Sequence, residues 1–281
     1  MSVHQLDPEH AASKRRAVTI RTLAKMRADG QRFSMVTASD AASARLVAAA
    51  DIPVILVGDS LAMVALGYPS TLHITLDEMV HHSRAVRRGA PEALIIADLP
   101  FGTFQRGVEA AVDAGVRLMQ DGHASGVKIE GGSAVVPQVK ALVTAGIPVM
   151  GHLGLTPQSV HQFGGFTVQA KDETAAATLV ADAQALETAG AFAVVIECVP
   201  DSVGKSATDA VSIPTIGIGA GPHTSGQVLV FHDLLGLTSG RLPRFVKPYA
   251  ALGDTIVTAL QAFDLEVQNG TFPGPEYCYG G

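Results

Sequence analysis

The sequence predicts a single (β/α)8 barrel, a TIM barrel, with one extra helix before its first strand. Short apolar runs alternate with segments of helical periodicity, which is typical of parallel strands joined by helical crossovers. The length of 281 residues suits one such barrel, which commonly needs roughly 250 residues. Repeats and linkers are lacking, so we expect a flexible amino-terminal segment at 1–16, a catalytic barrel at 17–273 and a tail at 274–281.

The composition supports a core of buried parallel strands. Hydrophobic residues make up 47% of the chain and aromatic residues only 5%, with no Trp, so the core must consist of Val, Ile, Leu and Ala. Such residues are typical of parallel strands that are covered on both faces. The net charge of −6 and the lack of a basic block make nucleic acid or an anionic membrane an unexpected partner.

The sequence favours a soluble, cytoplasmic protein. Cys198 and Cys278 are the only cysteines, too few for a disulfide scaffold in a chain of this length. Residues 1–16 are polar and lack the apolar centre of a signal peptide. No run of about 18 apolar residues indicates a membrane span.

Seven strands can be predicted directly, because each is a short apolar run that leads into a turn. They are Ser34–Ala38, Val54–Gly58, Ala93–Leu99, Gly126–Glu130, Pro148–His152, Phe192–Cys198 and Pro214–Gly219. A closed barrel needs an eighth strand, and Arg244–Lys247, just before the last helical pattern, is the predicted one.

Helix signals agree with this reading. Thr75 followed by Glu78 predicts a capping box, and Thr156-Pro157 predicts an N-cap with Pro at the first helical position. The segment Thr19–Ala28 predicts an extra helix that could cover the bottom of the barrel. The alternative, an open doubly wound sheet, lacks the glycine-rich turn expected after its first strand.

Charged residues are predicted at the carboxyl ends of five different strands. In a barrel these ends form one rim, where the active site is built. Buried charges are costly unless they are paired or bind a metal. The residues are Asp59, Asp98, Lys128, Glu130, His152 and Glu197.

Each of these residues also has a purely structural interpretation. Asp59 could cap a helix, Lys128 and Glu130 could form an ion pair on one face of a strand, and His152 could be a hydrogen-bonded core histidine. Glu197 could cap the next loop. Taken together, these interpretations require several coincidences on one rim, so we favour a functional site.

The ligand types point to a hard divalent cation. Carboxylates without a cluster of His or Cys suit Mg²⁺, which leaves coordination positions for water and a chelating substrate. His81 and His82 are adjacent on a predicted helix and cannot chelate one ion together. The glycine-rich loop Gly217–Gly221 could cradle a phosphate or allow close approach of a flat ligand or a neighbouring subunit, and we expect a helix around Val228–Leu235 to follow it.

Several motifs resemble the ketopantoate hydroxymethyltransferase family of the phosphoenolpyruvate/pyruvate barrel superfamily. The similarity extends from about Thr19 to Pro273. The motifs occur in the family's order, at 57–60 (VGDS), 97–102 (ADLPFG), 127–132 (VKIEGG), 151–158 (GHLGLTPQ), 216–221 (IGIGAG), 226–230 (GQVLV) and 245–247 (FVK).

The resemblance implies an activity. Members of the family transfer a hydroxymethyl group from 5,10-methylenetetrahydrofolate to the 2-oxo acid 3-methyl-2-oxobutanoate, which gives 2-dehydropantoate in pantothenate (coenzyme A) biosynthesis. It also implies a homo-oligomer, with a decamer as the family's form.

The resemblance further implies the site residues. The Mg²⁺ ligands would be Asp59, Asp98 and Glu130. The oxo acid would contact Asp59, Ser60, Asp98 and Lys128, with His152 as a pocket histidine. The general base would be Glu197.

Two other functions are compatible with such a barrel. One is C–C lyase or phosphonate chemistry on a 2-oxo acid, although neither cysteine is placed as the acid of a lyase loop. The other is a non-catalytic scaffold, which the retention of a reactive side chain at every matched position argues against.

Overall fold

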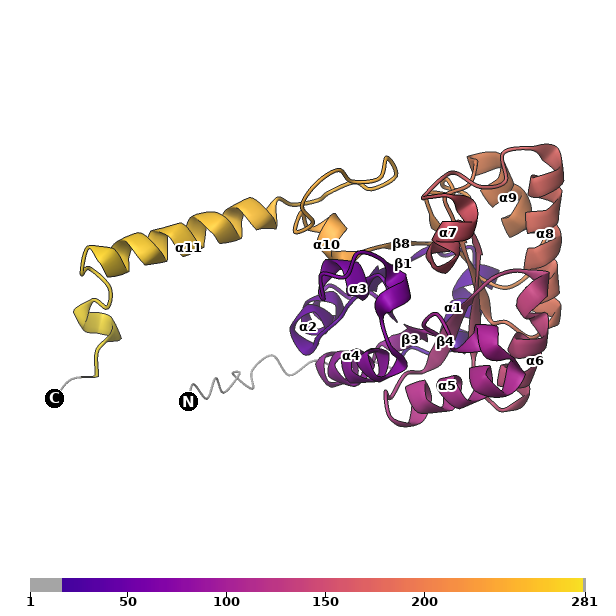
Figure 1. Cartoon of the computed structure of the whole chain (residues 1–281), viewed down its shortest axis with the longest axis horizontal. Helices are drawn as coiled ribbons and strands as arrows, with labels where there is room; N and C mark the ends of the chain where they lie inside the picture. The colour runs from indigo at the N-terminus through magenta and orange to yellow at the C-terminus, as the bar shows by residue number, and fades with distance from the viewer. Residues whose placement is uncertain (1–16, 280–281) are drawn as a thin grey trace. The chain divides into compact units, whose positions relative to one another are not determined.

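The computed structural model describes residues 17–279 and contains a closed barrel of eight parallel strands, in the order β1 to β8 around the barrel (Figure 1). The predicted fold class is therefore confirmed. The strands are β1 Phe33–Thr37, β2 Val54–Val57, β3 Leu94–Asp98, β4 Gly126–Glu130, β5 Val149–Gly154, β6 Ala193–Glu197, β7 Thr215–Ile218 and β8 Gly226–Leu229.

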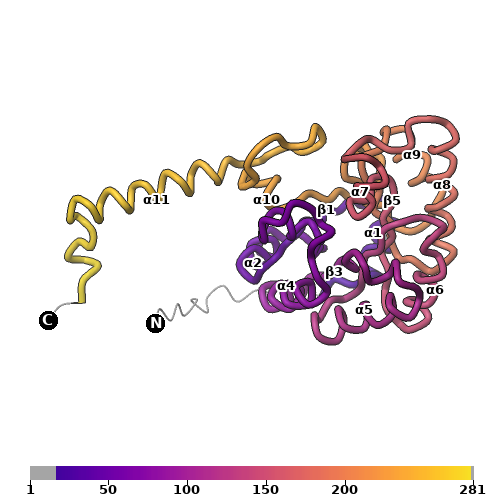
Figure 2. Tube along the Cα trace, in the orientation of Figure 1, coloured from indigo at the N-terminus to yellow at the C-terminus, as the bar shows by residue number. Residues whose placement is uncertain are grey.

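Helices follow most strands and pack around the barrel, so the central strands are buried on both faces (Figures 1 and 2). All residues of β2, β3 and β4 are buried. The helices of the barrel region are α1 Ile20–Ala28, α2 Ala41–Ala49, α3 Leu61–Val64, α4 Leu76–Gly89, α5 Val108–Gln120, α6 Val136–Thr144, α7 Val160–Phe163, α8 Glu173–Thr188 and α9 Asp201–Asp209.

Local sequence signals explain where several helices begin. The capping box predicted at Thr75 and Glu78 is present at the start of α4. Thr156 precedes the short 3-10 helix η4, Pro157–Ser159, but its side chain makes no capping hydrogen bond. The predicted position of this helix start is therefore right, and the predicted N-cap hydrogen bond of Thr156 is wrong.

The extra amino-terminal helix α1 covers the bottom of the barrel, as predicted. Leu23 of α1 is fully buried in one apolar cluster with Met35 and with Val54 and Leu94, the first residues of β2 and β3. This cluster fills the amino ends of the strands. The opposite ends, where the predicted charged residues lie, remain free for a site.

The predicted eighth strand is wrong. Arg244–Lys247 is not a strand, and the barrel is closed by β8 instead, which pairs with β7 through Ile216 and Gly226. The helix expected around Val228–Leu235 is correspondingly shorter, since α10 is Phe231–Leu234. The sequence of β8 is GQVL, which is not an apolar run. Its four residues alternate between buried and more exposed positions.

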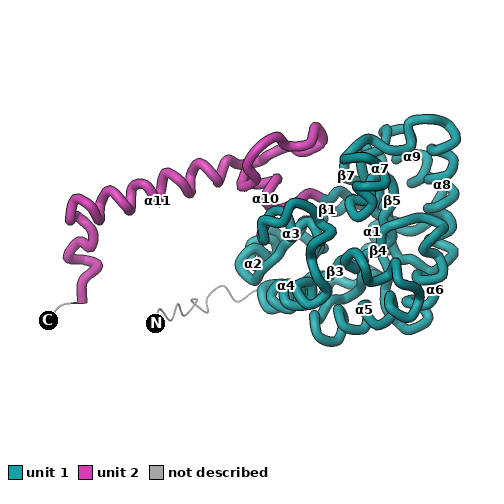
Figure 3. The backbone as a smooth tube through the Cα atoms, in the orientation of Figure 1, with its two compact units in different colours: residues 1–228 teal, residues 229–281 magenta. Residues whose placement is uncertain are grey.

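The chain forms two compact units, one ending at Val228 and the other beginning at Leu229 (Figure 3). The second unit contains α10, α11 Leu252–Gln268 and the 3-10 helix η5 Pro275–Tyr277. α11 is the predicted last helix, and none of its residues is buried. The domain boundaries stay a prediction, and residues 1–16 of the predicted flexible segment lie outside the described residues.

Two further observations concern the described part of the chain. Both Cys198 and Cys278 are free cysteines. Between residues 17 and 279, none of the helices combines the length and the apolar character needed to cross a membrane.

Candidate active site

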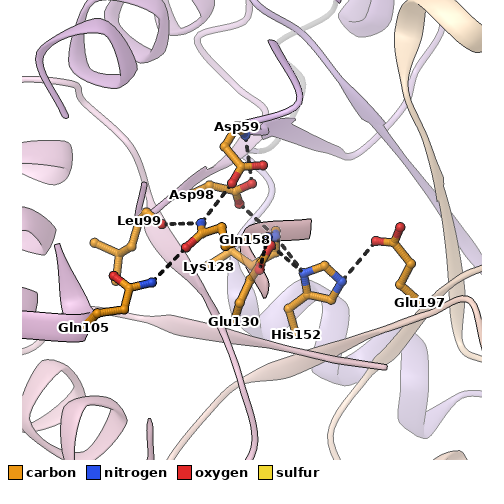
Figure 4. A network of polar contacts seen from close by, with 9 residues as sticks. All are labelled: Asp59, Asp98, Leu99, Gln105, Lys128, Glu130, His152, Gln158 and Glu197. Carbon is orange, nitrogen blue, oxygen red and sulfur yellow. Dashed lines mark hydrogen bonds and ion pairs between the residues drawn. The ribbon is translucent and has the colours of Figure 1, made fainter. Parts of the chain in front are cut away.

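The six predicted rim residues come together at the carboxyl ends of β2 to β6. Figure 4 shows them in one connected network with Gln158 and Gln105. Asp98 and Glu197 are the last residues of β3 and β6, and Asp59 lies just beyond β2. The barrel thus brings together side chains that are far apart in the sequence.

Asp59 and Asp98 form a buried acid pair. The Asp59 backbone N–H donates to Asp98 Oδ2 at 2.9 Å, and the two residues are 4% and 2% exposed. A Cβ on Gly58 would lie 3.6 Å from Asp98 Oδ2 and 3.0 Å from Ser60 Oγ, so glycine keeps this approach open. Burial, and then the charges of Asp98 and Glu130, raise the pKa of Asp59 well above its ordinary value.

Lys128 supplies the positive charge in the cluster. Its Nζ lies 3.2 Å from Asp98 Oδ1. Burial alone would lower the pKa of Lys128, but the carboxylates of Asp98, Glu130 and Asp59 together raise it above its ordinary value. The side chain is therefore an ammonium ion that can bind an anion.

His152 lies between Lys128 and Glu197, and its protonation follows from these neighbours. Lys128 Nζ is 3.0 Å from His152 Nδ1. An ammonium ion only donates, so Nδ1 is the acceptor and the ring proton is on Nε2. Burial and the charge of Lys128 lower the pKa of His152, which keeps the ring neutral.

The protonated nitrogen of this ring faces the predicted base. His152 Nε2 lies 3.1 Å from Glu197 Oε2, although the angles at this contact are outside those of a hydrogen bond. The Glu197 side chain is 15% exposed, whereas that of His152 is 3% exposed. Glu197 is therefore the more accessible end of the network.

Glu130 faces the same cluster from β4. Its Oε2 accepts from the backbone N–H of Gln158 at 3.0 Å, and its Oε1 lies 3.4 Å from His152 Nδ1. Burial raises the pKa of Glu130 to about 7, against the opposing effects of Lys128 and of the Gln158 backbone.

This pKa predicts a pH dependence of stability in protein kept in EDTA. Between pH 4.5 and about 7, the folded protein holds a proton on Glu130 that the unfolded chain releases. The contribution of Glu130 to stability is therefore fully present below that interval and is lost as the pH rises through it. Glu130→Gln should remove about 3 kcal/mol of this change, at 1.36 kcal/mol per pKa unit.

Urea unfolding of both proteins at several pH values measures the difference. Equal slopes for the wild type and the variant would contradict the raised pKa of Glu130.

Gln158 belongs to the site and was not predicted as a site residue. Its Nε2 donates to Asp59 Oδ2 at 2.8 Å and to the Leu99 carbonyl at 2.9 Å. An uncharged side chain in a loop gives no electrostatic signal in a sequence. The one available clue was its place at the end of the motif 151–158.

Ser60 follows Asp59 directly, just beyond the end of β2. It precedes the first residue of α3, and its side chain makes no capping hydrogen bond there. Its role as an oxo-acid contact stays a prediction.

The acid cluster fits a hard cation that also takes ligands from water and substrate. The buried atom Glu130 Oε1 makes no hydrogen bond within the described chain, and Asp98 Oδ1 has its ion pair with Lys128. Over residues 17–279, no three His, Cys, Asp or Glu side chains are grouped so as to hold an ion alone. Mg²⁺ commonly uses only one or two carboxylates and keeps several waters. Asp59 and Asp98 would provide these carboxylates.

A cavity of about 830 Å³ is lined in part by residues of the cluster. Its wall includes Glu130, His152 and Gln158, together with the aromatic residues Phe101 and Phe163. Loops after β3 and β5 provide much of this wall.

Solved structures of similar fold place the chain among TIM-barrel proteins. Phosphonopyruvate hydrolase, solved in complex with oxalate and Mg²⁺, is 14% identical with a TM-score of 0.61, and the match covers 93% of this chain and 91% of that one. A 2,3-dimethylmalate lyase is 17% identical with a TM-score of 0.58, covering 91% and 88%. At these identities the likeness concerns the fold alone.

Sequence comparisons give the family. The sequence model of ketopantoate hydroxymethyltransferase matches residues 17–275. Proteins named 3-methyl-2-oxobutanoate hydroxymethyltransferase are 52% identical in Heliobacterium modesticaldum, over 94% of this chain and 95% of that one, and 51% identical in Thermobifida fusca, over 99% and 100%. The chain belongs to the ketopantoate hydroxymethyltransferase family.

Proposed function

We propose that this protein transfers a hydroxymethyl group from 5,10-methylenetetrahydrofolate to 3-methyl-2-oxobutanoate, with Mg²⁺ as cofactor, in pantothenate biosynthesis. The relatives' names support the reaction. The observation that carries the chemistry is the buried acid pair Asp59 and Asp98 joined through Lys128 and His152 to Glu197 (Figure 4). In such an arrangement the oxo acid would be chelated at Asp59 and Asp98, and the separate carboxylate of Glu197 could accept a proton.

The cluster would bind and orient the oxo acid. Asp59 and Asp98 would hold Mg²⁺, with Glu130 as a further, water-mediated ligand. When bound, the ion supplies positive charge that stabilises negative charge on the keto oxygen. The ammonium of Lys128 would pair with the substrate carboxylate, and the hydroxyl of Ser60 would donate to it.

Glu197 would remove the proton from C3 of the oxo acid. The C3–H electron pair then forms the new bond to the methylene carbon, and water supplies the hydroxyl oxygen as tetrahydrofolate leaves. His152, with its proton on Nε2 beside Glu197 Oε2, would hold the carboxylate in place. A positioned base of this kind contributes about 10²- to 10⁴-fold to a rate.

The cavity supports a second, larger substrate. Its volume of about 830 Å³ is within the roughly 300–1,000 Å³ typical of sites for drug-sized ligands, and it exceeds what a five-carbon acid fills. Phe101, which is 47% exposed, lines its outer part. Aromatic rings at this place could stack on the flat pterin ring of a folate.

A coupled assay tests the proposal. The protein should form 2-dehydropantoate from 3-methyl-2-oxobutanoate only when 5,10-methylenetetrahydrofolate and Mg²⁺ are both present, and EDTA should stop the reaction. Full activity without folate, or cleavage of phosphonopyruvate in place of this reaction, would contradict it.

We also propose a homo-oligomer in the cytoplasm. The support for assembly is α11, whose apolar residues Ile256, Val257, Leu260 and Phe263 are 48–61% exposed, since large exposed apolar patches commonly mark interfaces. Light scattering after gel filtration measures the mass, and a stable monomer would contradict the proposal.

A further inference from the structure

The side chain of Gln158 contacts the acid cluster without being an acid or a base. Gln158 is 6% exposed and lies in the loop that follows β5, 99 residues from Asp59 in the sequence. Its Nε2 donates to Asp59 Oδ2 and to the Leu99 carbonyl. Both hydrogens of the amide group are therefore donated, one to the residue that follows β2 closely and one to the residue that follows β3.

A second glutamine, Gln105, contacts the amide oxygen of Gln158 and so helps to fix which end of that amide faces the acids. Gln105 Nε2 donates to Gln158 Oε1 at 3.1 Å, and Gln105 Oε1 accepts from the Gly102 backbone N–H at 2.8 Å. A backbone N–H can only donate, so the orientation of each amide follows in turn from Gly102. Turning the Gln158 amide over would place its oxygen against the Asp59 carboxylate and the Leu99 carbonyl.

The main chain of the same residue contacts another acid. The Gln158 N–H donates to Glu130 Oε2. One residue thus occupies Oδ2 of Asp59 and Oε2 of Glu130. The oxygens that receive no hydrogen bond from Gln158 are Asp59 Oδ1 and Glu130 Oε1, and the second of these is buried without a hydrogen bond in the described chain.

We propose that Gln158, oriented by Gln105, is a positioning residue that fixes which carboxylate oxygens of Asp59 and Glu130 face the cation. This proposal rests on the proposed function. The hydrogen bonds immobilise the Asp59 carboxylate before the ion arrives, so the ion does not have to order it. Partners of this kind behind metal ligands typically change metal affinity by about 10- to 100-fold.

Gln158→Met tests the proposal, because methionine has a similar length and volume but no donor. Its backbone N–H still reaches Glu130, so the loop keeps one anchor. We expect Mn²⁺, used as a spectroscopic substitute for Mg²⁺, to bind about 10- to 100-fold more weakly in the presence of 3-methyl-2-oxobutanoate. Electron paramagnetic resonance titration gives this affinity without any turnover. The KM for the oxo acid should rise by a larger factor than kcat falls.

Two more variants separate positioning from folding. Gln105→Met changes an exposed residue and should weaken Mn²⁺ binding in the same direction but less, since the Gln158 amide would lose the donor to its Oε1 and keep both acceptors of its Nε2. Gln138→Met is the matched control, because the Gln138 amide donates to the Phe104 carbonyl at 3.2 Å and contacts no acid. Its Mn²⁺ affinity should equal that of the wild type, whatever its melting temperature.

Each outcome decides one question. Unchanged Mn²⁺ affinity in Gln158→Met would overturn the positioning role while leaving the proposed function intact. If Gln158→Met does not fold, unchanged affinity in Gln105→Met would overturn the role, as would an equal loss in Gln138→Met. A wild-type protein that binds no Mn²⁺ with the oxo acid would overturn the proposed function, and the positioning role with it.

Discussion

Glu197→Gln should slow the exchange of the C3 hydrogen of 3-methyl-2-oxobutanoate with solvent deuterium by about 10²- to 10⁴-fold, the usual contribution of a general base. Glutamine has the shape of glutamate but cannot accept the proton. Asp98, Glu130 and Glu197 are the three carboxylates paired with Lys128 or His152, and Glu197 has the most accessible side chain of these three, at 15%. Proton NMR in D₂O, with Mg²⁺ and without folate, measures the exchange alone.

Two controls accompany this measurement. Mn²⁺ affinity should be nearly unchanged in Glu197→Gln, because Glu197 is not among the predicted ligands. Glu187→Gln changes a carboxylate of α8 that accepts from Ser212, and it should leave the exchange rate unchanged. Exchange at the wild-type rate in Glu197→Gln would remove Glu197 from the role of base.

Asp98→Asn should weaken Mn²⁺ binding by at least about 100-fold, since even residues behind the ligands change metal affinity by about 10- to 100-fold. The asparagine oxygen can still accept from the Asp59 N–H, as Asp98 Oδ2 does at 2.9 Å. The variant therefore removes a charge while it keeps the hydrogen bond from the Asp59 N–H. Lys128, which lies 3.2 Å from Asp98 Oδ1, would also lose its nearest carboxylate.

Calorimetric titration with Mg²⁺ plus oxo acid, or Mn²⁺ resonance, gives the affinity. Asp209→Asn is the control, since Asp209 pairs with Lys205 on α9 at the surface. Wild-type affinity in Asp98→Asn would show that the ion, if it binds, does not use this carboxylate.

The sequence was sufficient to predict the barrel and the meeting of the charged residues. Val54–Val57 and the first four residues of β3, Leu94 to Ala97, are uninterrupted apolar runs, which give strong strand signals. Once these strands are parallel neighbours, their carboxyl ends must lie on one rim. Asp98 and Glu197 were therefore placed by topology alone, without any knowledge of side-chain contacts.

Other features had no comparable signal. β8 has the sequence GQVL, in which glycine and glutamine hide a strand that is set by pairing with Ile216 and Gly217. Gln158 reaches Asp59 only because the loop after β5 folds back over the rim. Contacts of this kind depend on tertiary geometry, which no local periodicity encodes.

The polar groups and the walls of the cavity have different origins in the chain. Asp98, Lys128 and Glu130 are carried by strands of the buried barrel, whereas Phe101 and Phe163 are on segments between strands. Loop segments tolerate sequence change far better than buried strands do. Directed evolution toward bulkier oxo acids could therefore reshape the entrance while leaving the reactive machinery and the thermal tolerance of the scaffold untouched.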